Sequence, residues 1–143
     1  MPIPETLLQI REYTGIGYAP LIDFGAWRVA ILRYIDELLP QDLAKMQRHH
    51  ETDEVFVLLS GHCILFLGEG DKRVSGIYAQ DMAPLKLYNV KKGCWHTHTL
   101  SKDAVVLIVE NRDTSSSNSS ETVMEESQRK ELIELTKQLW KDK

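Results

Sequence analysis

The sequence contains little cysteine, no excess of positive charge and no long hydrophobic run. Its two cysteines, Cys63 and Cys94, are too few for the disulfide framework of a small secreted domain, so we interpret them as buried thiols in a reducing compartment. A formal net charge of −4 provides no basic surface for nucleic acid. No stretch approaches the roughly 18 apolar residues of a membrane helix, and the N-terminus lacks a basic leader followed by an apolar block. We therefore expect a cytoplasmic protein that binds neither nucleic acid nor membrane.

The composition that remains is that of an ordinary globular domain. Hydrophobic residues make up 43% of the 143 residues and charged residues 27%. A chain of this length buries roughly two thirds of the surface that its unfolded form exposes. We therefore expect one domain with a substantial core.

Residues 27–113 have the pattern of short strands separated by turns. Seven segments are rich in β-branched and aromatic residues, and glycines or a Ser-Lys-Asp turn separate several of them. These segments are WRVAILRY, EVFVLLS, HCILFLG, RVSGIYA, PLKLYNV, WHTHTL and AVVLIVEN. A series of short antiparallel strands predicts an all-β barrel or sandwich.

The segments around these strands are less regular. Residues 4–13 predict a short helix, which Gly15 and Gly17 would end. Residues 38–46 are compatible with an extended edge or with a helical turn. Residues 114–121 form a Ser-rich polar tract that predicts a mobile linker, so we divide the chain into a domain of residues 1–113, this linker and a C-terminal segment of residues 122–143.

Residues 122–143 predict an amphipathic helix. Thr122 and Glu125 have the spacing of a capping box, and the acidic residues lie early and the lysines late, as the helix dipole favours. One face carries the apolar residues Leu132, Leu135, Leu139 and Trp140. We expect this face to pack on the protein's own sheet or on a second subunit.

The stretch MQRHHETDEVFVLLSG concentrates histidines and acids just before a strand. His49 and His50 precede Glu54 by five and four residues, and Gly61 follows it by seven. Imidazole nitrogen and carboxylate oxygen are the ligands that Zn, Mn, Fe or Ni ions accept. Because side chains alternate along a strand, Glu54 and Phe56 share one face.

The stretch GCWHTH forms a second cluster. Its alternation places Cys94, His96 and His98 on one face of a strand, and Trp95 on the other. Two strands of one barrel that offer His and Glu on the interior face would complete a site with three or four ligands.

At these two stretches the sequence resembles a small single-domain cupin. That family's first motif is His-x-His, three or four residues, Glu, six residues and Gly, which HHETDEVFVLLSG matches in part; KKGCWHTHTL resembles the second, roughly Pro-x-Gly-x-x-His-x-x-x-Asn. The resemblance covers residues 27–111 and implies a cupin-like antiparallel β-barrel or jelly roll, to which the C-terminal α-helix is added. A strict His-x-His is absent, and Lys91 and Leu100 replace the usual proline and asparagine.

The resemblance also implies a divalent metal ion, which would be Zn, Mn, Fe or Ni. Residue by residue, it assigns Glu54 and His96 as ligands and either His49 or His50 as a third. A local bulge could turn both histidines inward, because an extra residue resets the alternation. His98, two positions after His96, is a further candidate.

The same family binds small molecules inside the barrel. Arg48 is a candidate for holding a carboxylate or phosphate, while Phe56, Tyr78 and Trp95 are candidates for core packing or for lining the binding site. We expect a homodimer that acts on a sugar derivative or a keto or hydroxy acid as a metal-dependent isomerase, lyase or dioxygenase. The alternative is a non-catalytic sensor or assembly module that has lost its metal.

Overall fold

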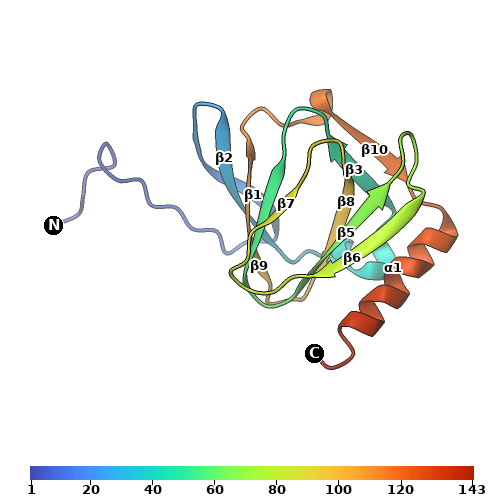
Figure 1. The fold of residues 1–143 in the computed structure, drawn as a ribbon. Coiled ribbons are helices and arrows are strands. Elements are labelled where there is room, and N and C mark those ends of the chain that lie inside the picture. Colours follow the sequence, from blue (N-terminus) through green and yellow to red (C-terminus); the bar gives the residue numbers. More distant parts are fainter.

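Two antiparallel sheets of five strands each form the body of the protein (Figure 1). The structure is a computed structural model that describes residues 1–143. The first sheet has the strand order β1-β2-β9-β4-β7 and the second has the order β10-β3-β8-β5-β6. The strands are β1 (Gly17–Phe24), β2 (Trp27–Arg33), β3 (Lys45–His49), β4 (Glu54–Ser60), β5 (Cys63–Glu69), β6 (Gly76–Asp81), β7 (Tyr88–Val90), β8 (Trp95–Leu100), β9 (Val105–Asn111) and β10 (Ser119–Val123).

The sequence prediction of an all-β barrel followed by a helix is confirmed. Each of the seven predicted strand segments contains an observed strand, from β2 and β4 through β9. Three strands were not predicted: β1, β3 and β10. The sheets therefore contain every predicted strand together with three strands of weaker hydrophobic pattern.

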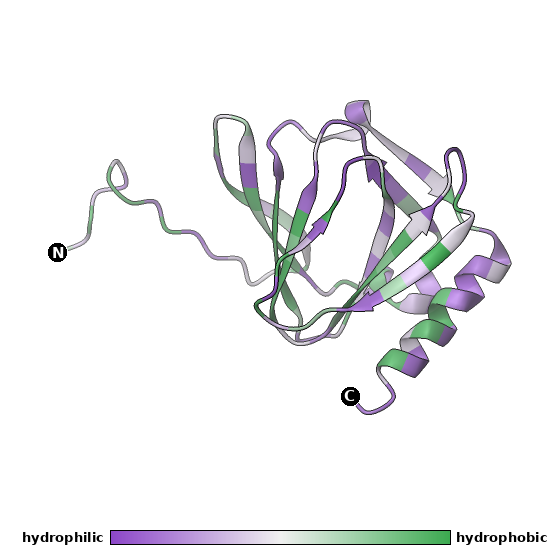
Figure 2. Ribbon diagram, viewed as in Figure 1, coloured by the Kyte–Doolittle hydropathy of each residue, from purple (hydrophilic) through white to green (hydrophobic).

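The main core lies between the sheets. Along β4 and β9, buried and half-buried residues alternate, because every second side chain points into the barrel. Hydrophobic residues dominate the lower part of the barrel in Figure 2, and hydrophilic residues are more frequent toward its upper end. The buried core residues are Ala30, Leu32, Phe56, Leu58, Cys63, Leu65, Met82, Val90, Leu100, Ala104, Val106 and Ile108.

The helix α1 (Glu126–Leu139) covers the outer face of the second sheet (Figure 1). Leu132 is fully buried there, and the indole Nε1 of Trp140 donates a hydrogen bond to Asp81 Oδ1 at 3.0 Å. Leu132 belongs to a second core with Leu43, Met46, Ile64, Phe66, Val74, Trp95 and Met124. Of the two expected partners for the apolar face, the structure therefore provides the protein's own sheet. None of the chain's helices has both the length and the apolar character needed to cross a membrane.

The prediction of a mobile linker over residues 114–121 is wrong, because its last three residues, 119–121, belong to a strand. Ser116–Asn118 form a single 3-10 turn, and β10 follows at once and pairs with β3, with Ser119 opposite His49. Serine side chains and backbone supply the hydrogen bonds in this segment, so its low hydrophobicity does not leave it free. The helix accordingly begins at Glu126 rather than Thr122, and its capping box joins Glu125 to Gln128.

The predicted N-terminal helix is also wrong. Residues 4–8 form one turn, in which the amides of Leu7 and Leu8 donate to the Pro4 carbonyl at 2.9 and 3.1 Å. Residues 1–16 extend away from the barrel (Figure 1), so no partner surface supports a longer helix. The ambiguous segment at residues 38–46 contains both alternatives, since the 3-10 helices η1 (Asp36–Leu38) and η2 (Pro40–Asp42) precede β3.

Candidate metal centre

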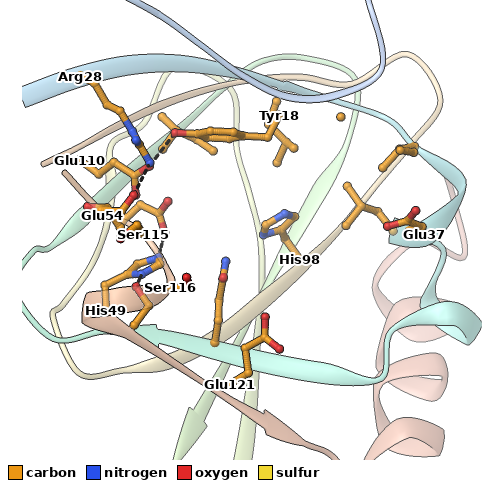
Figure 3. Close-up of a pocket in the computed structure, with 18 residues that line it drawn as sticks. Tyr18, Arg28, Glu37, His49, Glu54, His98, Glu110, Ser115, Ser116 and Glu121 are labelled. Carbon is orange, nitrogen blue, oxygen red and sulfur yellow. Dashed lines mark hydrogen bonds and ion pairs between the residues drawn. The ribbon is translucent and has the colours of Figure 1, made fainter. Parts of the chain in front are cut away.

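Side chains from three strands meet at one buried point in the barrel. His49 ends β3, Glu54 begins β4 and His96 lies in β8. The Nε2 atoms of His49 and His96 lie 3.4 and 2.9 Å from Glu54 Oε1, and the three ligand atoms lie within 4.8 Å of one another. All three residues are buried, with exposed fractions of 8%, 5% and 1%. Figure 3 shows His49 and Glu54 turned toward each other at the wall of a cavity.

Strand pairing determines which of the two adjacent histidines joins this group. Gln47 pairs with His96 across β3 and β8, and His49, two residues further, points to the same interior face. His50 follows the end of β3; its amide donates to the Asn118 carbonyl at 3.0 Å, and its Nε2 lies 2.6 Å from the Ser120 hydroxyl. The alternative between His49 and His50 is thus resolved geometrically in favour of His49, and no bulge turns both inward.

The second ring nitrogen of each inward histidine is held by a neighbour. His96 Nδ1 lies 3.0 Å from the backbone carbonyl of Cys94, which can only accept a hydrogen bond. His96 Nδ1 must therefore carry the proton, and in the neutral ring Nε2 keeps its lone pair toward Glu54. His49 Nδ1 lies 2.7 Å from the hydroxyl of Ser119. Such contacts orient metal-binding histidines in known proteins.

The atoms that point at one another are not hydrogen-bonded. Nε2 of His49, Oε1 of Glu54 and Nε2 of His96 are all buried without a hydrogen-bond partner. Unpartnered polar atoms are costly in a protein interior, and a cation that accepts their lone pairs would remove that cost. Two imidazoles and one carboxylate suit Zn, Mn, Fe or Ni, and three ligands leave coordination positions for water or substrate. The residues present therefore fit a divalent metal ion.

The electrostatics of the group follow from its burial and its mixed charge. Burial acts to raise the pKa of Glu54, but the contacts with His49 and His96 outweigh it and lower the pKa below the ordinary value. The contact with Glu54 raises the pKa of His49, while burial opposes this change. Glu54 is thus a carboxylate at neutral pH, which is the form that binds a cation.

His49 and Glu54 line a cavity of about 530 Å³. This volume is within the range of sites that hold small molecules. Only five of the 18 lining residues are hydrophobic. They are Gly17, Tyr18, Arg28, Leu32, Ile35, Glu37, Leu38, Gln47, His49, Glu54, His98, Ile108, Glu110, Thr114, Ser115, Ser116, Ser119 and Glu121.

A second polar cluster, absent from the sequence predictions, forms one wall of this cavity (Figure 3). Glu110 Oε1 accepts hydrogen bonds from the Tyr18 hydroxyl at 2.6 Å and from Arg28 Nη2 at 2.8 Å. Burial and the charge of Glu54 raise the pKa of Glu110. Arg28 and Glu110 are charged residues at inward positions of β2 and β9, and a charge at a position that alternates with core residues is the signal that could have identified them.

His98 lines the cavity but does not join the three converging atoms. Figure 3 shows its ring projecting into the cavity, and its Nδ1 is buried without a hydrogen-bond partner. Burial lowers the pKa of His98 to about 4, so the ring is neutral at physiological pH. It can therefore donate one hydrogen bond and accept another.

None of the four residues proposed for substrate binding lines this cavity. Arg48 lies on the opposite face of β3, where its guanidinium stacks on Trp95 at 4.3 Å from the ring centroid. Trp95 is buried in the core under α1, and Phe56 is buried in the core between the sheets. Tyr78 is 58% exposed and donates a hydrogen bond to Glu69 at 2.6 Å. Besides β3, β4 and β8, the lining comes from β1, β2, β9, the segment around η1 and the 114–121 segment.

The fold is shared with solved structures, although no family model and no curated protein matches the chain. A variant of Streptomyces Pac13 solved with uridine has a TM-score of 0.55 at 10% identity, with 80% of this chain and 86% of that chain covered. Another structure of Pac13 describes it as a nucleoside dehydratase. A protein from Planctomyces limnophilus has a TM-score of 0.51 at 14% identity, covering 83% and 96% of the two chains.

A ketoisomerase shares the fold as well. A variant of the 3,4-ketoisomerase QdtA from Thermoanaerobacterium thermosaccharolyticum, in complex with TDP, has a TM-score of 0.53 at 17% identity, with 69% of this chain and 68% of that chain covered. Identities this low are evidence for the fold only. With the two motif stretches placed on strands β3, β4 and β8 of a ten-stranded double sheet, the resemblance is confirmed, and the chain has the fold of a small single-domain cupin.

Proposed function

We propose that the chain is a metal-binding cupin that acts on a small polar molecule in the barrel interior, such as a sugar derivative or a keto or hydroxy acid. One observation carries this proposal: three buried ligand atoms without hydrogen-bond partners converge, and two of them, from His49 and Glu54, lie at the wall of a cavity. The role of an assembly module does not require such an arrangement. The likeness in fold to a nucleoside dehydratase and a 3,4-ketoisomerase supports a small hydroxylated substrate.

In this proposal His49, Glu54 and His96 hold the ion. A divalent ion bound there would supply a Lewis acid able to polarise a carbonyl or hydroxyl oxygen of the substrate. The chain's own residues orient the substrate and exchange protons with it. His98 is a neutral imidazole that projects into the cavity, and Tyr18 presents a hydroxyl at its wall. This set of groups suits isomerases, lyases and dioxygenases.

Elemental analysis tests the proposal on protein purified without added metal. We expect close to one divalent ion per chain in the wild type and a loss of most of it in His96→Ala. His50→Ala is the matched control, because that ring faces Ser120 rather than Glu54 and its removal should leave the metal content unchanged. Substoichiometric metal in wild type and His96→Ala alike would overturn the enzyme proposal and favour a metal-free sensor.

We also propose that the protein is a homodimer. Residues 1–16 extend from the barrel with several apolar side chains in solvent, among them Ile3, Leu7 and Ile10 with exposed fractions of 60%, 78% and 75%. A surface of this kind is covered when a second copy binds it. Light scattering at micromolar concentration tests this, and a clean monomer would contradict it.

We propose a cytoplasmic location as well. Both cysteines are free, and burial raises the pKa of the Cys63 thiol, which keeps it unreactive. Free buried thiols suit a reducing compartment. Fractionation of cells that express the tagged chain would test this location.

A further inference from the structure

The charged side chains that line the cavity beside the candidate metal centre are mainly negative. Four carboxylates line it, from Glu37, Glu54, Glu110 and Glu121, whereas Arg28 contributes the one cationic side chain of the lining (Figure 3). An acidic wall attracts cationic ligands and repels anionic ones. The charge of the lining therefore bears on the class of ligand.

Arg28 is not available to bind an anion. Its Nε and Nη2 atoms donate to Glu110 Oε1 at 3.1 and 2.8 Å. Its Nη1 donates to the Arg112 carbonyl at 3.0 Å, and Nη2 also donates to the Thr114 carbonyl at 3.2 Å. An incoming carboxylate or phosphate would have to break these bonds and would leave Glu110 buried without its cation.

The acidic character continues outside the cavity. Glu37 and Glu121 are exposed, and a shallow depression next to Glu37 adds the carboxylates of Asp36 and Asp42. Lys45 is the one cation of that depression, and its Nζ lies 3.2 Å from Glu121 Oε2. This exposed ion pair holds Lys45 only weakly. Glu37 has no ion pair, so the rim keeps an excess of negative charge.

Three polar atoms in the cavity wall are buried and have no partner within the chain. Glu54 Oε1 and His49 Nε2 belong to side chains that are more than nine-tenths buried, and in the proposed function they hold the metal ion. His98 Nδ1 is the third such atom, and it stays available to a ligand. A neutral imidazole offers one donor and one acceptor, which suits the hydroxyl groups of a hydroxylated molecule.

We infer that the cavity selects a hydroxylated ligand that carries an ammonium group, and disfavours ligands that carry a free carboxylate or phosphate. The inference rests on the proposed function and narrows its small polar molecule to an amine-bearing one. A divalent ion at His49, Glu54 and His96 would offset the inner carboxylates. At the rim, Glu37 would stay uncompensated, and Glu121 would be offset only by its exposed ion pair with Lys45. The ammonium group of the ligand would occupy that rim.

Nitroxide probes that differ only in charge test this selectivity without knowledge of the substrate. 4-Amino-TEMPO, 4-hydroxy-TEMPO and 4-carboxy-TEMPO are titrated into labelled protein, and the paramagnetic relaxation of the Ser116 and His98 amides is compared with that of the distant Gly76 amide. At the Ser116 and His98 amides, we expect the paramagnetic relaxation caused by the cationic probe to exceed that caused by the anionic probe by at least about threefold. Equal relaxation, or a larger effect of the anionic probe, would overturn the inference.

A double variant that removes the two carboxylate charges of the rim tests whether the preference for the cationic probe comes from the rim. Glu37→Gln with Glu121→Gln should bring the ratio close to one, whereas the matched double variant Glu131→Gln with Glu134→Gln on the exposed face of α1 should leave it unchanged. An unchanged ratio in the rim variant would also overturn the inference. All measurements are made on metal-free and Zn-loaded protein. A failure to bind zinc would reject the proposed function. The ratio of the relaxation caused by the cationic and anionic probes can still be measured on the metal-free sample, so the two failures are distinguishable.

Discussion

His96 Nε2 lies 2.9 Å from Glu54 Oε1, yet the two atoms form no hydrogen bond. The other nitrogen of His96 holds its proton toward the Cys94 carbonyl, so in the neutral ring two lone pairs face each other at this distance. Such an arrangement is repulsive unless a proton or a cation lies between the atoms. The close approach therefore fits a cation site, to which His49 would add a third ligand.

The hydroxyl of Ser119 should support this site through His49. It contacts His49 Nδ1 at 2.7 Å, and loss of an outer contact of this kind lowers metal affinity by about 10- to 100-fold in known proteins. We expect Ser119→Ala to weaken zinc binding by about 10-fold, measured by competition with a chromophoric chelator.

The neighbouring serine is the matched control for that measurement. Ser120 makes the equivalent contact with His50, at 2.6 Å, outside the candidate site. Ser120→Ala should therefore leave zinc affinity unchanged. Equal losses in the two variants would mean that the effect comes from the pairing of β10 with β3 and not from the ring of His49.

The Arg28–Glu110 pair should contribute to stability as well as to the cavity wall. Their side chains are only 19% and 3% exposed, and removal of one partner leaves the other buried without its counter-charge. We expect Glu110→Ala to lower the free energy of unfolding by about 3 kcal/mol, measured by urea denaturation. Glu121→Ala, in an exposed pair with Lys45, should change it by less than about 0.5 kcal/mol, and similar values for the two would contradict this account.

The sequence predicted the centre of this site better than its walls. Strand alternation and motif spacing identified Glu54 and His96, because both depend on local order within one or two strands. The choice of His49 over His50 depends on pairing between β3 and β10, which are 70 residues apart at the Ser119 contact. A pairing between segments so far apart cannot be inferred from the local sequence.

The sequence predictions missed Arg28, Glu110 and strand β10 for related physical reasons. Arg28 and Glu110 come from two predicted strands whose pattern is mainly hydrophobic, β2 and β9. β10 is polar because it lies at a sheet edge, where hydrogen bonding to β3 and not burial keeps it in place. Hydrophobic patterning detects buried faces, and therefore finds neither polar walls nor polar edges.

Helix α1 should be held by its buried leucine. Leu132 is fully buried against the second sheet, whereas Leu139 on the same helix is 37% exposed. We expect Leu132→Ala to lower the free energy of unfolding by about 3 kcal/mol and Leu139→Ala by less than about 1 kcal/mol, both measured by urea denaturation. A small effect of Leu132→Ala at all protein concentrations would show that the helix is not docked on its own barrel.

The buried imidazole of His98 should make the metal-free protein sensitive to acid. Burial lowers its pKa from the ordinary 6.5 to about 4, so between these values the unfolded chain binds a proton that the folded chain does not. Stability is therefore lost as the pH falls below 6.5, and the loss is complete near pH 4. From pH 7 to pH 5 the expected loss from this group is about 2 kcal/mol.

Comparison with His98→Gln isolates this contribution, because glutamine keeps a donor and an acceptor but does not titrate. Urea denaturation of both proteins in the presence of a chelator gives the free energy of unfolding at each pH. The glutamine variant should gain about 2 kcal/mol relative to wild type between pH 7 and pH 5, whatever its stability at pH 7. Other groups, such as Glu54 and His49, titrate in both proteins and cancel in the difference. A difference that stays constant with pH would show that the His98 ring is solvated or protonated in the folded protein, and would remove it as the neutral group of the cavity.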